Sequence, residues 1–179
     1  MIDLRFSELP SHIECGGSFY KLDTSFRTWI EFGRALSENR AAYLGIFDGA
    51  VPEGDWLGAV MEFFESRNVC PHDVPASDAR ALDLLTDGDM IVAAFQQAYG
   101  IDLTSCDMHW HRFKALLANL PEDTRLAKVI GYRTYETPRK GDTTDAQMKR
   151  LRRQWSLPDP DAERERDELL EWSDNALPW

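Results

Sequence analysis

The sequence predicts a mainly α-helical protein with an N-terminal β-hairpin, an orthogonal or antiparallel bundle of several helices, and a C-terminal helical arm. Apolar residues alternate around Gly16-Gly17, recur at helical spacing over most of the chain up to Thr134, and give way to charged residues beyond it. With 179 residues, 43% of them hydrophobic, the chain is long enough for one ordinary domain and too short for two full ones. We predict a core domain, made of the hairpin and the helices, over residues 1–136. A basic helix and an acidic arm are predicted over 137–179.

The hairpin and the first helix follow from local signals. Gly16-Gly17 can take the positive φ values of a tight turn between strands at residues 12–15 and 18–22. Asp23-Thr24-Ser25 then offers capping side chains for a helix on which apolar residues from Phe26 onward recur at helical spacing. A β-to-α change of period near residue 24 is therefore expected.

Six further helices are predicted from caps, breakers and periodicity. They cover residues 40–47, 52–64, 87–100, 104–120, 122–130 and 143–155. Pro52 suits a first helical turn, and Gly100 is placed to end its helix in the left-handed conformation. Thr104 or Ser105 is expected to cap the longest helix, and Gly131 to stop the helix that follows it.

Cys106, His109 and His111, with Cys70 and His72 upstream, are the candidates for a metal site. Zinc takes Cys and His ligands tetrahedrally. On one helix, however, His109 and His111 would point about 160° apart, so that one ion could not take both. Cys106 would lie on the apolar stripe of that helix, where a free cysteine behaves as a small hydrophobic residue. We therefore predict no metal and no other cofactor.

The chain is not expected to be an enzyme, and we assign no catalytic residues. Cys106 with a nearby histidine would need an activated thiolate and an orienting third group, yet the thiol falls on the side predicted to be buried. No GxGxxG, GxxxxGK[ST], HExxH or GxSxG motif is present.

Nucleic acid and membranes are not expected as partners. The 20 Lys and Arg against 31 Asp and Glu give a net charge of −11, which repels phosphate. Residues 87–120 could be interpreted as a helix-turn-helix, but the expected outward positions are poor in groups that grip DNA: Asp107, His111, Lys114 and Ala118. The basic stretch 149–153 is a better candidate, although such runs are more often solvated faces. No apolar stretch approaches the roughly 20 residues that span a bilayer.

Tryptophans divide into two groups. Trp29, Trp56 and Trp110 fall on helical apolar stripes and are predicted to be core. The surroundings of the other three cannot cover them locally, and acidic residues alternate there with apolar ones. Such a segment stays soluble alone and can fold on a hydrophobic partner. The predicted partner-binding residues are Trp155, Leu169, Leu170 and Trp172. The alternative is that the arm docks back on its own core, with its acidic face on the basic helix.

Two blocks of the chain resemble the bacteriophage gene-product-fifteen family. The first is residues 20–32, and the second combines residues 93–104 with Met108-His109-Trp110, residues 113–117 and Gly131-Tyr132-Arg133-Thr134. The resemblance does not extend to residues 68–85 or to the tail after Pro158. His109, Trp110 and Arg133 match the pattern, either as residues that set the fold or as partner contacts.

The resemblance implies a role in the assembly of phage tails. Proteins of this kind are encoded in the tail-morphogenesis region of long-tailed phages and prophages, near the tape-measure protein. This implies a non-catalytic tail assembly chaperone that binds the tape-measure protein in the bacterial host cytoplasm, with other tail proteins or a second copy as further partners. The alternatives are a structural tail component retained in the virion and a DNA-binding prophage regulator.

Overall fold

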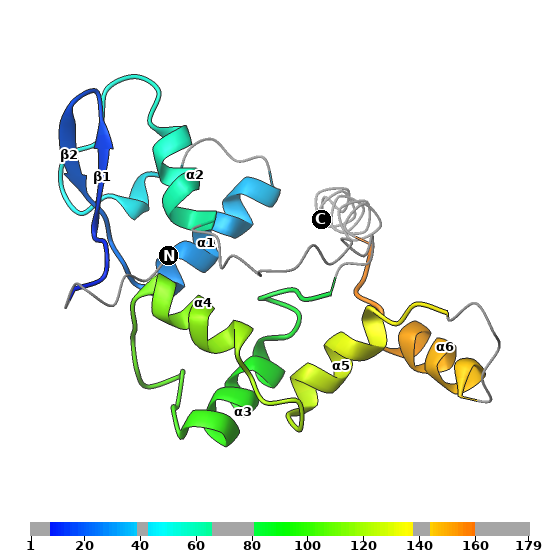
Figure 1. Cartoon of the computed structure of the whole chain (residues 1–179). Coiled ribbons are helices and arrows are strands. Elements are labelled where there is room, and N and C mark those ends of the chain that lie inside the picture. Colours follow the sequence, from blue (N-terminus) through cyan, green and yellow to red (C-terminus); the bar gives the residue numbers. More distant parts are fainter. Residues whose placement is uncertain (1–7, 39–42, 66–80, 138–143, 160–179) are drawn as a thin grey trace, which may run out of the picture. The chain divides into compact units, whose positions relative to one another are not determined.

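The computed structural model of the chain describes residues 8–38, 43–65, 81–137 and 144–159 (Figure 1). These residues form a two-stranded hairpin, six α-helices and one short 3-10 helix, which confirms the predicted mainly helical class. The chain divides into two compact units, residues 1–75 with 89–124 and residues 76–88 with 125–179. The boundary predicted at residue 137 stays a prediction.

The predicted hairpin is confirmed. Strands β1 (His12–Cys15) and β2 (Ser18–Lys21) pair antiparallel, with Cys15 opposite Ser18. The turn residues Gly16 and Gly17 have φ values of 57° and 77°, the left-handed region that a glycine pair adopts without a steric penalty.

Helix α1 (Phe26–Ser37) starts where the cap cluster predicts. Ser25 is its N-cap residue, but the cluster works through Asp23, whose carboxylate accepts from the Ser25 backbone N–H at 2.8 Å and from the Thr28 hydroxyl at 2.7 Å. The aspartate thus fixes the turn that leads into the helix.

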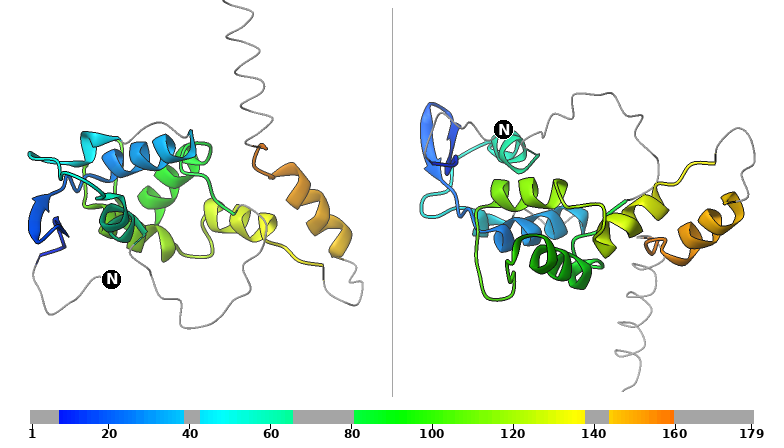
Figure 2. Two further views of the ribbon diagram at one scale, coloured as in Figure 1. Left: turned by 90° about the horizontal axis from the view of Figure 1, so that it is seen from above. Right: turned by 60° about the horizontal axis from the view of Figure 1, so that its bottom comes forward.

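Figure 2 shows the helices of the first unit in two further views. A run of aromatic rings that joins four of them forms the core of this unit. Phe113 of α4 (Trp110–Ala118) stacks on Phe26 of α1 at 4.8 Å and on Phe95 of α3 (Gly88–Tyr99) at 5.4 Å. Trp29 of α1 contacts Phe63 of α2 (Leu57–Glu65) at 4.7 Å. Each such pair contributes about 0.5–1.5 kcal/mol beyond its buried area.

Two predicted helices of the first unit differ from the structure. In place of a helix over residues 40–47, the structure has a 3-10 helix at Leu44–Ile46, and residues 39–42 lie outside the described residues. Helix α2 begins at Leu57 and not at Pro52, which leaves Trp56 before the helix and half-buried. Trp29 and Trp110 are buried, as predicted. Helix α3 ends at Tyr99 and Gly100 has a φ of 65°, which confirms the predicted left-handed stop.

The helix predicted over residues 104–120 is much shorter. Thr104 and Ser105 do not cap it, because both donate to the carboxylate of Asp102, at 2.6 and 3.0 Å. Those hydrogen bonds hold residues 102–106 in a turn and hold the pKa of Asp102 below its usual range, the Thr104 hydroxyl contributing most. Helix α4 begins only at Trp110.

The second unit contains α5 (Arg125–Arg133) and α6 (Asp145–Gln154), which pack together. Helix α6 confirms the predicted basic helix. Gly131 does not stop α5 but lies inside its last turn, and the helix continues to Arg133.

Candidate interaction surface

Of the four predicted partner-binding residues, Trp155 is described. It is half-buried at the end of α6, with the Arg125 guanidinium 5.1 Å from its ring centroid. Its backbone carbonyl accepts a hydrogen bond from Arg133 Nε at 2.6 Å. Leu169, Leu170 and Trp172 lie outside the described residues. Trp155 therefore has a structural contact within the second unit.

Arg133 is at the centre of the polar contacts of the second unit. Its guanidinium donates to both oxygens of Asp87, at 2.6 and 2.9 Å, and to the Ala81 carbonyl at 3.1 Å. Both side chains are buried, with 5% and 1% of their surfaces exposed. Asp87 immediately precedes α3, and its carboxylate accepts from Arg133 and from the Asp83 backbone N–H. The arginine of the Gly-Tyr-Arg-Thr block therefore sets the fold.

Trp110 of the other block, together with Lys114, holds the end of α2. Trp110 Nε1 donates to the Phe64 carbonyl at 3.0 Å, and the Lys114 ammonium donates to the same carbonyl and to that of Glu65. These groups satisfy carbonyls that a helix end leaves without a partner, and a cation is favourable there. Burial lowers the pKa of Lys114 to about 8.

These contacts overturn the predicted outward face of a helix-turn-helix. His111 is buried with 5% of its surface exposed, and Lys114 is half-buried against α2. Two of the four positions that the helix-turn-helix interpretation places outward therefore contact this protein instead.

The geometric argument against a metal site was wrong, because His109 is not in a helix. It is the N-cap residue of α4, and its Nδ1 accepts the His111 backbone N–H at 3.1 Å. The two imidazole centroids are 5.1 Å apart. Within the described parts of the chain, no three His, Cys, Asp or Glu side chains gather where they could hold a metal ion. Cys70 and His72 lie outside those parts.

The nucleophile hypothesis loses its structural premise. Cys106 is half-buried in the turn at 102–106 and not in the first turn of a helix. Its backbone N–H donates to the Asp102 carbonyl at 3.1 Å, so no helix N-terminus is placed to activate the thiol.

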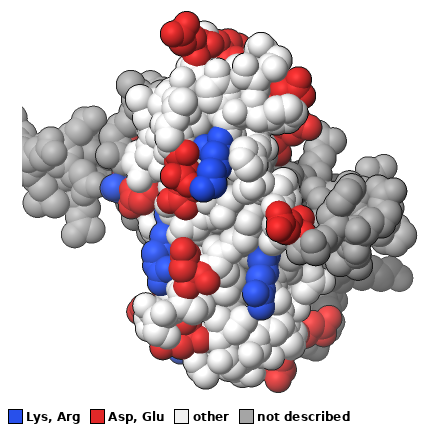
Figure 3. All heavy atoms as spheres, turned by 90° about the vertical axis from the view of Figure 1, so that its left-hand side faces the viewer, with Lys and Arg blue, Asp and Glu red and all other residues white. Residues whose placement is uncertain are grey.

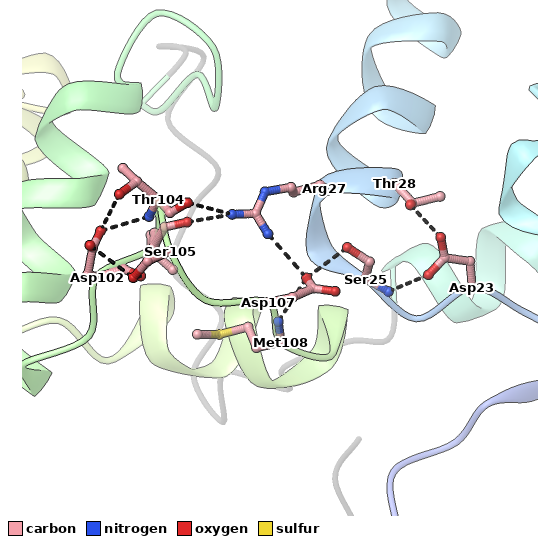
Figure 4. Close-up of polar contacts among 10 residues, drawn as sticks. Asp23, Ser25, Arg27, Thr28, Asp102, Thr104, Ser105, Asp107 and Met108 are labelled. Carbon is pink, nitrogen blue, oxygen red and sulfur yellow. Dashed lines mark hydrogen bonds and ion pairs between the residues drawn. The ribbon is translucent and has the colours of Figure 1, made fainter.

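A polar cluster joins the loop 102–108 to the start of α1 (Figure 4). Asp107 accepts from the Ser25 hydroxyl at 2.8 Å and pairs with Arg27 at 3.5 Å. Arg27 also donates to the Leu103 carbonyl at 2.7 Å. The contacts join side chains and backbone groups of this chain, so the cluster orders a long loop.

The face that carries the hairpin is a candidate surface for a partner. Figure 3 shows this face as largely uncharged, with acidic groups spread over it and fewer basic ones. Phe19 of β2 has 74% of its surface exposed, and Leu57 at the start of α2 has 46%. Residues 43–65 include five acidic residues and no Lys or Arg. Apolar side chains in an acidic setting characterise this face.

The fold and these clusters define a mainly helical protein whose described buried polar groups hold its own helices and loops together. Residues 61–157 match the family model described as Bacteriophage Gp15 protein. The match covers more than half of the chain, so the chain belongs to the bacteriophage Gp15 family. It begins after the block at residues 20–32 and includes residues 68–85, which the sequence resemblance left out. No curated protein and no solved structure matches the chain.

No helix in the parts of the chain that the structure describes is long and apolar enough to cross a membrane.

Proposed function

We propose that the chain is a non-catalytic tail assembly chaperone, which binds the tape-measure protein in the cytoplasm of the bacterial host. The observation that carries the proposal is membership in the Gp15 family, because the resemblance links that family to the tail-morphogenesis region beside the tape-measure protein. The described clusters around Arg133, Trp110 and Asp107 are used to hold the fold, which agrees with a role in binding.

The charge of the chain suits this role. A tape-measure protein is a very long helical chain whose apolar stripes would aggregate before the tail tube surrounds them. A small protein with a net charge of −11 would cover those stripes and add solubilising charge. Several weak contacts serve better than one tight one, because tube growth must later displace the chaperone.

Trp155, Leu169, Leu170 and Trp172 remain the proposed apolar contacts of the arm. Leu169, Leu170 and Trp172 follow a run of acidic residues, and Asp174 comes after them. An acidic segment with interspersed Leu and Trp can fold onto an apolar helix.

Co-expression with the tape-measure protein of the same phage tests the proposal. We expect the wild-type chain to raise the soluble fraction of the tape-measure protein and to co-purify with it. Replacing Leu169, Leu170 and Trp172 by Ser should weaken that capture, while the matched replacement of Asp161, Glu163 and Glu165 by Ser should leave apolar contact intact. A tape-measure protein that stays insoluble with the wild-type chain would contradict the proposal. Finding the chain by mass spectrometry in finished virions would instead favour a structural tail component.

A further inference from the structure

A groove of about 550 Å³ lies between β1 and α2 in the first unit. Ile13 and Glu14 of β1 form one wall, and Ala59, Glu62 and Phe63 of α2 form the other. His111 of α4 also lines it. The volume falls in the range of pockets that take small ligands, so the groove can hold a few side chains of a partner.

His111 carries a buried hydrogen-bond acceptor beside this groove. Its Nε2 lies 2.9 Å from the Phe63 carbonyl. A carbonyl can only accept, so Nε2 carries the hydrogen and Nδ1 is a bare acceptor. Nδ1 is buried, and among the described residues no group bonds to it. Burial lowers the pKa of His111 to about 4, so the ring is neutral at pH 7 and keeps that acceptor.

The rim of the groove is acidic. Glu14 and Glu62 stand on opposite walls, and both are exposed. Neither carboxylate has an ion-pair or hydrogen-bond partner within the described ranges 8–38, 43–65, 81–137 and 144–159. The groove thus combines apolar side chains, two carboxylates that have no partner in the described part of the chain, and a buried acceptor beside it.

We propose that this groove binds a helical segment of the tape-measure protein that presents an arginine between apolar side chains. The inference rests on the proposed chaperone function and names the surface and the chemistry of its partner. A guanidinium supplies planar donors for the two exposed carboxylates of the rim. The apolar neighbours of that arginine contact Ile13 and Ala59.

Charge reversal on the rim is the main test. Glu14→Lys with Glu62→Lys changes two exposed side chains, and Glu53→Lys with Glu122→Lys is the matched control, because both pairs are exposed and alter the net charge equally. With the co-expressed tape-measure protein, we expect the groove variant to weaken capture about tenfold or more and the control to remain close to wild type. Ala59→Trp, which fills the groove without changing charge, should weaken capture as well.

A second experiment does not require the tape-measure protein. The full chain is titrated with a synthetic amphipathic helical peptide that carries one arginine in a leucine stripe, and with the same peptide carrying glutamine there. We expect the arginine peptide to bind about tenfold more tightly, and the rim variant to lose that preference.

The outcomes separate the two ideas. Equal binding of both peptides overturns the groove inference. Capture of the tape-measure protein at the wild-type level by both groove variants overturns it as well. If the peptide preference holds but the wild-type chain does not capture the tape-measure protein, the ligand chemistry of the groove stands and the proposed function fails.

Discussion

Removing the charge of Asp87, which is buried, is expected to lower the free energy of unfolding far more than removing the charge of an exposed carboxylate that pairs with an arginine over a similar distance. Asp87→Asn keeps the shape of the side chain and removes the charge that faces Arg133. The remaining guanidinium, 5% exposed, would be a buried cation without a counter-ion. Breaking a buried pair in this way typically costs about 3–5 kcal/mol.

The exposed pair of Glu31 and Arg34 is the matched control. Its closest N–O distance is 2.9 Å, against 2.6 and 2.9 Å for the two contacts between Arg133 and Asp87, but 44% of the Glu31 side chain and 37% of the Arg34 side chain are exposed. Solvent screens this pair, so Glu31→Gln should cost about 0.5 kcal/mol or less. Comparing the two variants therefore shows mainly the effect of burial on the strength of an ion pair.

Urea unfolding of the full chain, followed by far-UV circular dichroism, measures both changes. Hydrogen exchange of the α5 amides reports the second unit directly. Arg133→Met is the second single variant of a double-mutant cycle. It leaves the Asp87 carboxylate and the carbonyls of Ala81 and Trp155 without this donor. We expect the double variant to be less unstable than the sum of the single variants by about 2 kcal/mol or more. Equal losses for Asp87→Asn and Glu31→Gln would refute the reasoning.

Three further predictions concern the first unit. Folding lowers the pKa of His111 from its ordinary value of 6.5 to about 4, so the unfolded state binds more protons than the folded state between these two pH values. The free energy of unfolding should therefore fall by about 3 kcal/mol through this group as the pH is lowered from 7 to 4. In the His111→Asn variant, the free energy of unfolding should depend less on pH over this range. An unchanged pH dependence of the unfolding free energy in this variant would contradict the prediction for His111. Gly17→Ala forces a side chain to φ 77° and should cost about 1–2 kcal/mol in thermal unfolding, whereas a neutral effect would mean that the turn relaxes. Trp110→Phe removes the bond to the Phe64 carbonyl and also part of a buried ring system, so it should cost about 2 kcal/mol or more in urea unfolding. No loss of stability would contradict both contributions.

Sequence signals predicted correctly those features of the fold that depend on the backbone conformation of one or two residues. The glycine pair predicts the hairpin turn, and Gly100 predicts the end of α3, because each acts through its own φ. The start of α4 could not be found in this way. The sequence offers Thr104 and Ser105 as caps, but Asp102 takes both hydroxyls into a turn. A long-range contact decides the true start.

That contact is made by His109, which few sequence rules would select as an N-cap. Its Nε2 lies 2.8 Å from the Pro10 carbonyl, 99 positions earlier in the chain. The carbonyl holds the hydrogen on Nε2, which leaves Nδ1 free to accept the His111 N–H and begin the helix. Pairing of Asp87 with Arg133 likewise extends α5 past Gly131. Tertiary contacts override propensity at both places.

The same dependence explains why the groove was missed. Its walls come from residues 13–14 and 59–63, and its acceptor comes from His111, so no window of sequence contains it. The error over α4 hid the acceptor as well: a helix begun at residue 104 turns His111 outward, while one begun at Trp110 buries it against Phe63. A histidine that looked like a solvent-facing position is therefore a buried polar group beside the groove. Its tautomer follows from the carbonyl that it contacts, and its neutrality follows from burial. Any protein in which that carbonyl contact is kept should also keep the bare Nδ1, whatever residues form the rim.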